Sequence, residues 1–209
     1  MNYTDIYVVR HAESVANVEH RLASRTDVPL SENGEQQAEA LAAALRGRIA
    51  LSAVVSSPLT RAFNTAAAIA EVFGLEVTIR EELTEQHLGR FSGMSYREVE
   101  QEPGYCHDRT ARWDWIPEGG GESYQMIARR LVPFFQWLEA RESEGPLIVV
   151  THAVTMRLIR GHLEQTLPAY PETIAGNGEV WHVQYSRLGD QHTVETLALR
   201  ETRVTRHGA

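Results

Sequence analysis

The sequence predicts an α/β protein built as a three-layer sandwich, with a mainly parallel central sheet and helices on both faces. Short continuous apolar runs, which suit buried parallel strands, occur at residues 6–9, 53–55, 77–79 and 147–150. Helical patterns lie between these runs, so strands and helices alternate along the chain. The 209 residues are 43% hydrophobic and 23% charged, a composition that supports a sizeable buried core.

The first two helices are predicted from their caps and their apolar periodicity. One follows Ser31, a favoured N-cap residue, and ends before Gly47. The next takes Ser57 as its cap and Pro58 as its first residue, where the missing N–H of proline costs nothing. Apolar residues recur every three or four positions in both helices, and we expect Phe63 to face inward from the second.

Two more helices and two more strands complete the alternating order. One helix is predicted over about residues 123–142, with a kink at Pro133, and another over about 154–163. Late strands are predicted at 180–185 and 193–197.

The segment at about 94–118 fits neither a helical nor a strand period well. We expect a single domain over residues 1–209, with an insertion at about 94–118 that is rich in Tyr and Trp. The tail at 201–209 is expected to fray.

Composition excludes several classes of function. All 20 basic side chains are Arg, which excludes Schiff-base lysine chemistry and the Walker phosphate loop. The net charge of -8 argues against nonspecific nucleic-acid binding. A single Cys allows no internal disulfide, and the nine His residues are scattered without a metal-ligand spacing, so we expect no metal and no cofactor. No apolar run approaches the length of a membrane span, and we expect a cytoplasmic protein.

Two histidines occupy equivalent places in the predicted sheet. His11 follows the first strand by one residue, and His152 follows the strand at 147–150 by one residue. Parallel strands end at the same edge of a sheet, which is where open α/β sheets bind ligands. The sequence therefore predicts that both rings belong to one site.

The residues around His11 carry a family resemblance. Residues 10–14 read Arg-His-Ala-Glu-Ser and are followed by Asn17. This run resembles the Arg-His-Gly-Glu-Thr motif, with its following Asn, of the histidine phosphatase superfamily, the phosphoglycerate-mutase-like proteins. Further stretches resemble successive signatures of that family and follow its order: Asp27-Val28-Pro29-Leu30-Ser31 with Gly34 and Gln37, Ser56-Ser57-Pro58-Leu59-Thr60-Arg61-Ala62, Leu83-Thr84-Glu85 with Gly89 and Gly93, Gly120-Gly121-Glu122-Ser123, and Val149-Val150-Thr151-His152.

The resemblance implies a phosphoglycerate-mutase-like fold and a transient phosphohistidine on His11. It also implies that Glu85 is the proton donor to the departing alkoxide and the base for the water that hydrolyses the phosphoenzyme. Chemistry supports a neutral imidazole as nucleophile, because a phosphomonoester repels an anionic one. A phosphate dianion beside Glu85 disfavours the ionised carboxylate and so prepares the acid.

Four more residues are candidates for binding the phosphoryl group. The forked guanidiniums of Arg10 and Arg61 match phosphoryl oxygens in a way that Lys does not. We expect His152 to donate to a nonbridging oxygen of the transferring group and Asn17 to add a further donor.

The sequence departs from the family pattern where Ala12 and Ala153 stand in place of its usual Gly, which is costly only if the backbone there requires a positive φ. A rival site is offered by Cys106 and Arg112, whose spacing is that of a cysteine-dependent phosphatase loop. Neither flank of that pair shows the strand and helix that such a loop requires, so we expect Cys106→Ser to leave turnover intact.

The predicted function is hydrolysis of a small phosphorylated metabolite. Mutase-type phosphoryl transfer goes with a longer and more basic insertion in the family, whereas 94–118 holds only three Arg. A non-catalytic regulatory or binding module of the same fold is a further alternative. The sequence leaves open the natural substrate and whether the chain forms a homodimer.

Overall fold

A six-stranded sheet forms the centre of the protein, whose computed structural model describes residues 3–141 and 144–199. The strand order is β3-β2-β4-β1-β5-β6. The strands are β1 (Thr4–Arg10), β2 (Ala53–Ser56), β3 (Val77–Ile79), β4 (Leu147–Thr151), β5 (Val180–Tyr185) and β6 (Glu195–Thr196). Pairing is parallel from β3 through β1 and antiparallel for β5 and β6, which confirms a mainly parallel sheet.

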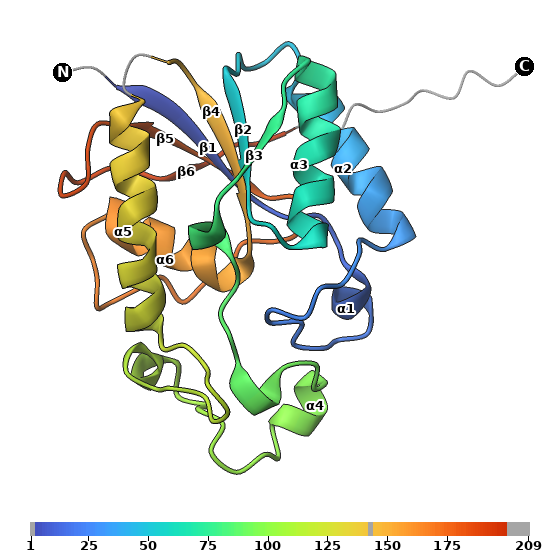
Figure 1. Cartoon of the computed structure of the whole chain (residues 1–209), viewed down its shortest axis with the longest axis vertical. Helices are drawn as coiled ribbons and strands as arrows, with labels where there is room; N and C mark the ends of the chain where they lie inside the picture. The colour runs from blue at the N-terminus through green and yellow to red at the C-terminus, as the bar shows by residue number, and fades with distance from the viewer. Residues whose placement is uncertain (1–2, 142–143, 200–209) are drawn as a thin grey trace, which may run out of the picture.

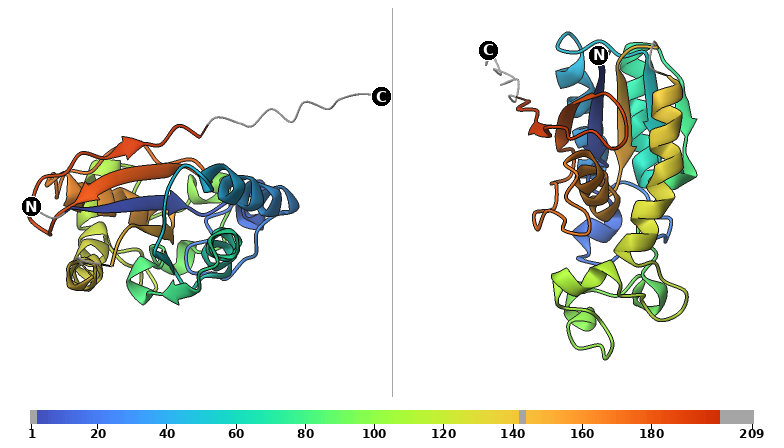
Figure 2. Two further views of the ribbon diagram at one scale, coloured as in Figure 1. Left: turned by 90° about the horizontal axis from the view of Figure 1, so that it is seen from above. Right: turned by 90° about the vertical axis from the view of Figure 1, so that its left-hand side faces the viewer.

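Helices cover both faces of the sheet, as the three-layer prediction requires. The α-helices are α1 (Val15–Val18), α2 (Glu32–Leu45), α3 (Thr60–Phe73), α4 (Tyr96–Val99), α5 (Tyr124–Ala140) and α6 (Ala153–Leu163), and the 3-10 turns are η1 (Glu81–Leu83), η2 (Gly89–Phe91) and η3 (Arg109–Trp113). Figures 1 and 2 show α2 and α3 on one side of the sheet and α5 and α6 on the other.

Side-chain alternation along the strands explains the two apolar layers. Ile6 and Val8 of β1 pack with α5 and α6, while Tyr7 and Val9 pack with α2 and α3. Successive residues of a strand point to opposite faces, so a strand that is buried on both faces must be apolar throughout. This is why the central strands appear in the sequence as continuous apolar runs.

The start of α2 is as predicted and is fixed against the segment that follows β1. Ser31 Oγ accepts from Gly34 N at 3.0 Å, which caps the helix. Gly34 packs directly on Glu13, since a Cβ at Gly34 would come within 1.8 Å of Glu13 O. The first turn of α2 therefore packs on Glu13, which follows His11 by two residues in the sequence.

The predicted start of α3 is wrong. The helix begins at Thr60, and Ser57 and Pro58 lie before it. Asp27, from a distant segment, takes the role expected of Ser57, because its carboxylate accepts from Thr60 N and Oγ1 at 2.8 and 2.7 Å. The prediction that Phe63 faces inward is also wrong, because Phe63 is 40% exposed.

Predicted and observed bounds differ slightly at the later elements. Helix α5 starts close to the predicted residue 123, with Ser123 as its N-cap, and continues through Pro133 to Ala140. Glu142, the predicted end, and the tail at 201–209 lie outside the described residues. Strand β6 is only two residues long, within the predicted 193–197.

Segment 94–118 lies beyond the carboxyl ends of the parallel strands, at the bottom of Figure 1. It contains α4 and η3 and no strand. Tyr105 and Trp115 pack their rings against Phe91, with centroids 5.4 and 5.9 Å away. No helix among the described residues is long and apolar enough to cross a membrane.

Candidate active site

The structure brings together His11 and His152, which are 141 positions apart in the sequence. Their ring centroids are 5.1 Å apart and the ring planes are tilted by 60°. Strands β1 and β4 are parallel neighbours in a register that pairs Arg10 with Thr151, and His11 N donates to Thr151 O at 2.9 Å. The proximity of the rings is therefore a direct consequence of strand pairing.

The main chain fixes the tautomer of His11. Its Nδ1 lies 2.6 Å from Ala12 O, and because a carbonyl can only accept, Nδ1 carries the hydrogen. The lone pair is then on Nε2. This arrangement leaves the Nε2 lone pair available for reaction with an electrophile.

His152 is oriented by a residue that the sequence analysis assigned to a helix cap. Its Nε2 lies 2.7 Å from Ser57 Oγ. Ser57 Oγ accepts from Leu59 N at 3.3 Å and has a hydrogen and a second lone pair left for the ring. Nδ1 of His152 is buried without a partner among the described residues. Nδ1 is therefore the ring nitrogen left for a further hydrogen bond.

Both imidazoles are neutral in the folded protein. Burial lowers the pKa of His11 and of His152 well below the ordinary value, and the positive charge of Arg61 lowers both further. A neutral imidazole has a lone pair with which it can act as a nucleophile.

Two arginines supply positive charge beside the histidines. Arg61 is 2% exposed and donates from Nη2 to Ser24 O at 2.7 Å and from Nη1 to Thr26 O at 3.0 Å. Arg10 donates from Nη1 to Ala175 O at 2.6 Å, and its Nε is buried without a partner among the described residues. Because these partners are neutral carbonyls, the guanidinium charges remain available to an anion.

Arg61 is aimed by Ser24, which the sequence analysis missed. Ser24 has φ 53, a left-handed conformation that is uncommon for a residue with a side chain. This turn directs Ser24 O at Arg61, while Ser24 Oγ donates to Gln86 O at 2.8 Å and accepts from Leu88 N at 2.9 Å. Ser24 therefore joins the arginine to the loop that carries Glu85.

Glu85 lies at the N-terminus of α6, the helix that follows His152. Its carboxylate accepts from the N–H groups of Val154 and Thr155, each at 3.2 Å, and from Gln86 N at 2.9 Å. Helix N-termini favour negative groups, so these donors hold the carboxylate in one place. The acidic group is thereby fixed on the same edge of the sheet as both rings.

Asn17 lines the same cavity and uses its amide oxygen within the protein. Oδ1 accepts from Ser14 N at 3.0 Å and from Asn177 Nδ2 at 3.2 Å, which leaves Nδ2 to donate. Asn177 also donates to His11 O at 2.9 Å. Asn177 precedes β5, and no motif in the sequence distinguishes it.

Most of these groups border a cavity of about 540 Å³, whereas His152 is buried behind His11 and is not among the residues that line it. The inner wall is made by the candidate residues Arg10, His11, Asn17, Arg61 and Glu85. The outer wall comes largely from segment 94–118, with Tyr96, Val99, Glu100, Tyr105, His107, Arg109 and Arg112. The cavity is of the size that takes a small molecule.

Comparison with known proteins settles the family. The model of the histidine phosphatase superfamily (branch 1) matches residues 6–197. The chain belongs to this superfamily. Among relatives, a metal-independent phosphoserine phosphatase of Arabidopsis thaliana is 34% identical over 169 residues, which cover 79% of this chain and 71% of the relative. A glucosyl-3-phosphoglycerate phosphatase of Mycobacterium tuberculosis is 31% identical over 194 residues, which cover 87% and 84%.

A solved structure agrees over nearly the whole chain. The native structure of a mycobacterial glucosyl-3-phosphoglycerate phosphatase superposes with a TM-score of 0.80 at 26% sequence identity. The match covers 93% of this chain and 98% of that one. The expected phosphoglycerate-mutase-like fold is confirmed.

The two departures from the histidine phosphatase motif cause no backbone strain. Neither Ala12 nor Ala153 is among the described residues with positive φ. Ala12 is fully buried against Leu30 and Ala38, and its N–H donates to Thr65 Oγ1 at 3.1 Å. A methyl group is therefore accommodated at both positions.

The rival cysteine site lacks the architecture that it needs. Cys106 follows a turn, with no buried strand before it, and Sγ is directed at Asp108 O, 3.0 Å away. Arg112 donates from Nε to Cys106 O at 3.1 Å. Among the described residues, no group of three or more His, Cys, Asp or Glu is placed to hold a metal ion.

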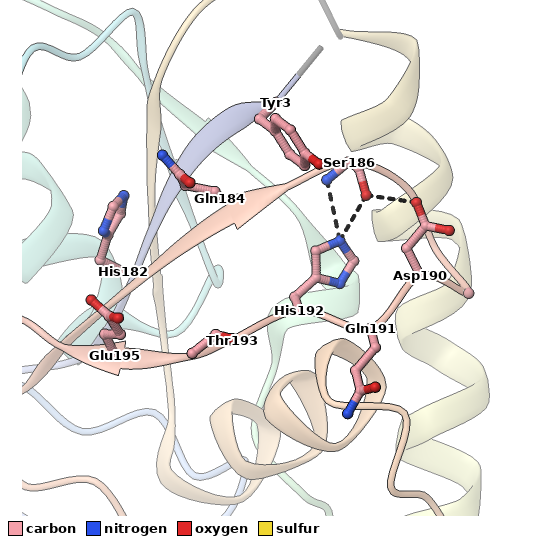
Figure 3. A pocket seen from close by; sticks show the side chains of 10 residues that line it. Tyr3, His182, Gln184, Ser186, Asp190, Gln191, His192, Thr193 and Glu195 are labelled. Atoms are coloured by element: carbon pink, nitrogen blue, oxygen red, sulfur yellow. Dashed lines mark hydrogen bonds between the residues drawn. The ribbon is translucent and has the colours of Figure 1, made fainter. Parts of the chain in front are cut away.

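A second cavity, of about 770 Å³, lies away from these residues on the β5–β6 hairpin (Figure 3). His192 Nε2 is 3.0 Å from Ser186 Oγ, which donates to Asp190 at 2.7 Å. His182 is paired with Asp5 at 2.8 Å. Both imidazoles are engaged by neighbouring side chains, and none of the candidate catalytic residues lines this cavity.

The lowered pKa values of His11 and His152 predict acid sensitivity. In the unfolded chain both rings titrate near 6.5, whereas in the folded protein they stay neutral to well below that value. As pH falls below about 6.5 the unfolded state binds protons that the folded state does not, so the free energy of unfolding falls. The slope reaches about 1.4 kcal/mol per pH unit for each ring.

Urea unfolding measured between about pH 7.5 and 5.5 tests this dependence. We expect His152→Gln to reduce the slope by up to about 1.4 kcal/mol per pH unit, because one titrating ring is removed, while His11 and His162, whose pKa values are also lowered by burial, keep their contributions. His20→Gln, at an exposed position, is the matched control and should keep the wild-type slope. An unchanged slope in His152→Gln would contradict the assignment.

Proposed function

We propose that the protein hydrolyses small phosphomonoesters through a phosphohistidine on His11. The observation that carries the proposal is the neutral His11 ring, held by Ala12 O so that the Nε2 lone pair is available. Two arginines lie beside it, and the hydrogen bonds that they make to residues 3–141 and 144–199 all go to main-chain carbonyls. Such a site favours an anionic substrate and a neutral nucleophile.

In the first step, His11 Nε2 attacks phosphorus, the N–P bond forms and the P–O bond to the leaving group breaks. Arg10, Arg61 and the Nδ1–H of His152 donate to the oxygens that carry the developing charge. Glu85, in its protonated form, transfers its proton to the departing alkoxide. The phosphate group beside it favours that protonated form, as like charges oppose ionisation.

In the second step, the Glu85 carboxylate takes a proton from water, which attacks the phosphohistidine. The N–P bond breaks and inorganic phosphate leaves, while His11 returns as a neutral imidazole. Glu85 is then protonated again for the next turnover. One residue therefore serves as acid and base in turn.

Hydrolysis is favoured over phosphoryl transfer and over a non-catalytic role. The relatives described above are named as phosphatases. Segment 94–118 is short, and the arginines that it contributes to the cavity wall are Arg109 and Arg112. The nucleophile, its two arginines and the proton donor all border one cavity, which a binding module does not need.

The proposed mechanism uses protein groups alone. Two guanidiniums and His152 stabilise the transferring phosphoryl group, the role that metal ions have in other phosphatases. A relative's name, metal-independent phosphoserine phosphatase, supports this reading. We also place the activity in the cytoplasm, the location expected from the sequence.

The outer wall of the cavity favours a small substrate with negative charge on its leaving group. Arg112 donates from Nη2 to Tyr105 OH at 2.9 Å, and Arg109 from Nη1 to Glu172 O at 3.4 Å, so both guanidiniums are bonded to neutral oxygens. A carboxylate on the leaving group would be drawn to them.

Replacing the nucleophile should abolish turnover. We expect His11→Ala to lower phosphate release from 4-nitrophenyl phosphate by about 10³-fold or more, because no other group can accept the phosphoryl. Rapid quenching with labelled substrate should yield an acid-labile phosphoprotein from the wild type only. Cys106→Ser is the control and should match the wild type in both assays; turnover retained in His11→Ala would remove the proposed nucleophile.

Replacing the proton donor should have an effect that depends on the leaving group. We expect Glu85→Gln to lower kcat/KM for a simple alkyl phosphate by about 10²-fold, since an alkoxide needs a proton. The loss should be much smaller for 4-nitrophenyl phosphate, whose phenolate leaves without one. Equal losses on both substrates would exclude proton donation by Glu85.

A substrate panel tests size, charge and metal dependence together. We expect kcat/KM to be about tenfold higher for a small phosphate ester with a carboxylate on its leaving group than for a neutral ester of equal size. A chelator should leave the rates unchanged. Preference for a phosphopeptide, or loss of activity with chelator that a divalent metal restores, would contradict the proposal.

A further inference from the structure

Glu122, which the proposed mechanism does not use, holds two arginines next to the loop that carries Glu85. Its Oε2 accepts from Arg25 Nη2 at 2.7 Å, and its Oε1 accepts from Arg130 Nε at 3.1 Å. The Glu122 side chain is only 13% exposed. A carboxylate this buried is retained only with such partners, so the three side chains act as one unit.

The same residue is bonded to the backbone of that loop. Glu122 N donates to His87 O at 2.8 Å, and Glu122 Oε2 accepts from His87 N at 3.1 Å. The buried Gln86 side chain donates from Nε2 to Glu122 O at 2.7 Å. Backbone and carboxylate of Glu122 together fix the two residues that follow Glu85.

Arg25 and Arg130 also bind main-chain carbonyls, at Glu85 itself and at a residue before it. Arg25 donates from Nε to Glu85 O at 3.1 Å. Arg130 donates from Nη1 to Glu82 O at 2.6 Å, three residues before Glu85. Glu122 sets the position of both guanidiniums. They in turn bind the main chain at Glu82 and Glu85, and so fix the position of the Glu85 carboxylate.

We propose that Glu122 is a positioning residue for the proton donor, acting on Glu85 through Arg25, Arg130 and the backbone at 86–87. This inference rests on the proposed function, because it assigns Glu122 to the step in which the leaving group is protonated. Among the described residues, no hydrogen bond or ion pair joins Glu122 to His11, Arg10 or Arg61. Loss of the Glu122 charge should therefore impair proton donation more than phosphoryl binding.

The test is the leaving-group dependence of Glu122→Gln, a substitution that keeps shape and removes charge. We expect kcat/KM, which reports the phosphorylation step, to fall about tenfold for a simple alkyl phosphate and by less than about threefold for 4-nitrophenyl phosphate. A merely structural role would lower both values by the same factor, and that outcome would overturn the inference.

Two further variants guard against misfolding and nonspecific effects. Arg25→Gln changes a side chain that is 36% exposed and should show the same unequal loss, because the hold on Glu85 O is removed. Glu164→Gln removes an ion pair of similar exposure away from the site, Arg160–Glu164 at 2.8 Å, and should leave both substrates unaffected. Equal losses for the two substrates in Arg25→Gln would also overturn the inference.

Failure of this inference can be separated from failure of the proposed function. If Glu85→Gln shows no leaving-group dependence, the proton donor is wrong and Glu122 has nothing to position. If Glu85→Gln shows leaving-group dependence and Glu122→Gln does not, only the positioning role of Glu122 is contradicted. In the double variant, Glu122→Gln should add little to Glu85→Gln, since both act on one step.

Discussion

The pairing of β1 with β4 is the constraint on which the site depends. Their parallel register places Arg10 opposite Thr151, and the bond from His11 N to Thr151 O continues that ladder one residue beyond β1. The two imidazoles are therefore brought together by main-chain hydrogen bonds. A one-residue slip in register would also exchange the faces of every side chain in the strand, so the apolar packing on both sides of the sheet protects the catalytic geometry.

A second constraint is that the site buries the positive charge of Arg10 and Arg61, and no ion pair within the described part of the chain neutralises either guanidinium. Main-chain carbonyls of Ser24, Thr26 and Ala175 hold Arg10 and Arg61 instead of carboxylates. Burying charge in this way costs stability in the empty protein, and an anion that binds there offsets the cost. The left-handed backbone at Ser24 belongs to the same arrangement, because it aims a carbonyl where no regular element would place one.

Sequence reasoning succeeded where the cause was local and failed where it was long-range. The Ser31 cap of α2 was predictable because the cap and the N–H that it binds are three residues apart. The start of α3 was not, since Asp27 caps it from 33 positions away and frees Ser57 to bond His152. Asn177 and Glu122 reach their partners across the fold; Glu122 lies in the Gly120-Gly121-Glu122-Ser123 signature, but that signature does not indicate which residues it binds.

The sequence by itself determined the order of strands and helices, and the positions of His11 and His152 just after two buried strands, because apolar periodicity is a property of neighbouring residues. With the motifs of the family it also predicted which residues carry the chemistry. Only the tertiary structure decided which nitrogen of His11 is free, which carbonyls orient the arginines, and how Glu85 is held at the start of α6. Those features depend on hydrogen bonds between segments that are far apart in the chain, and such bonds exist only once the sheet has brought the segments together.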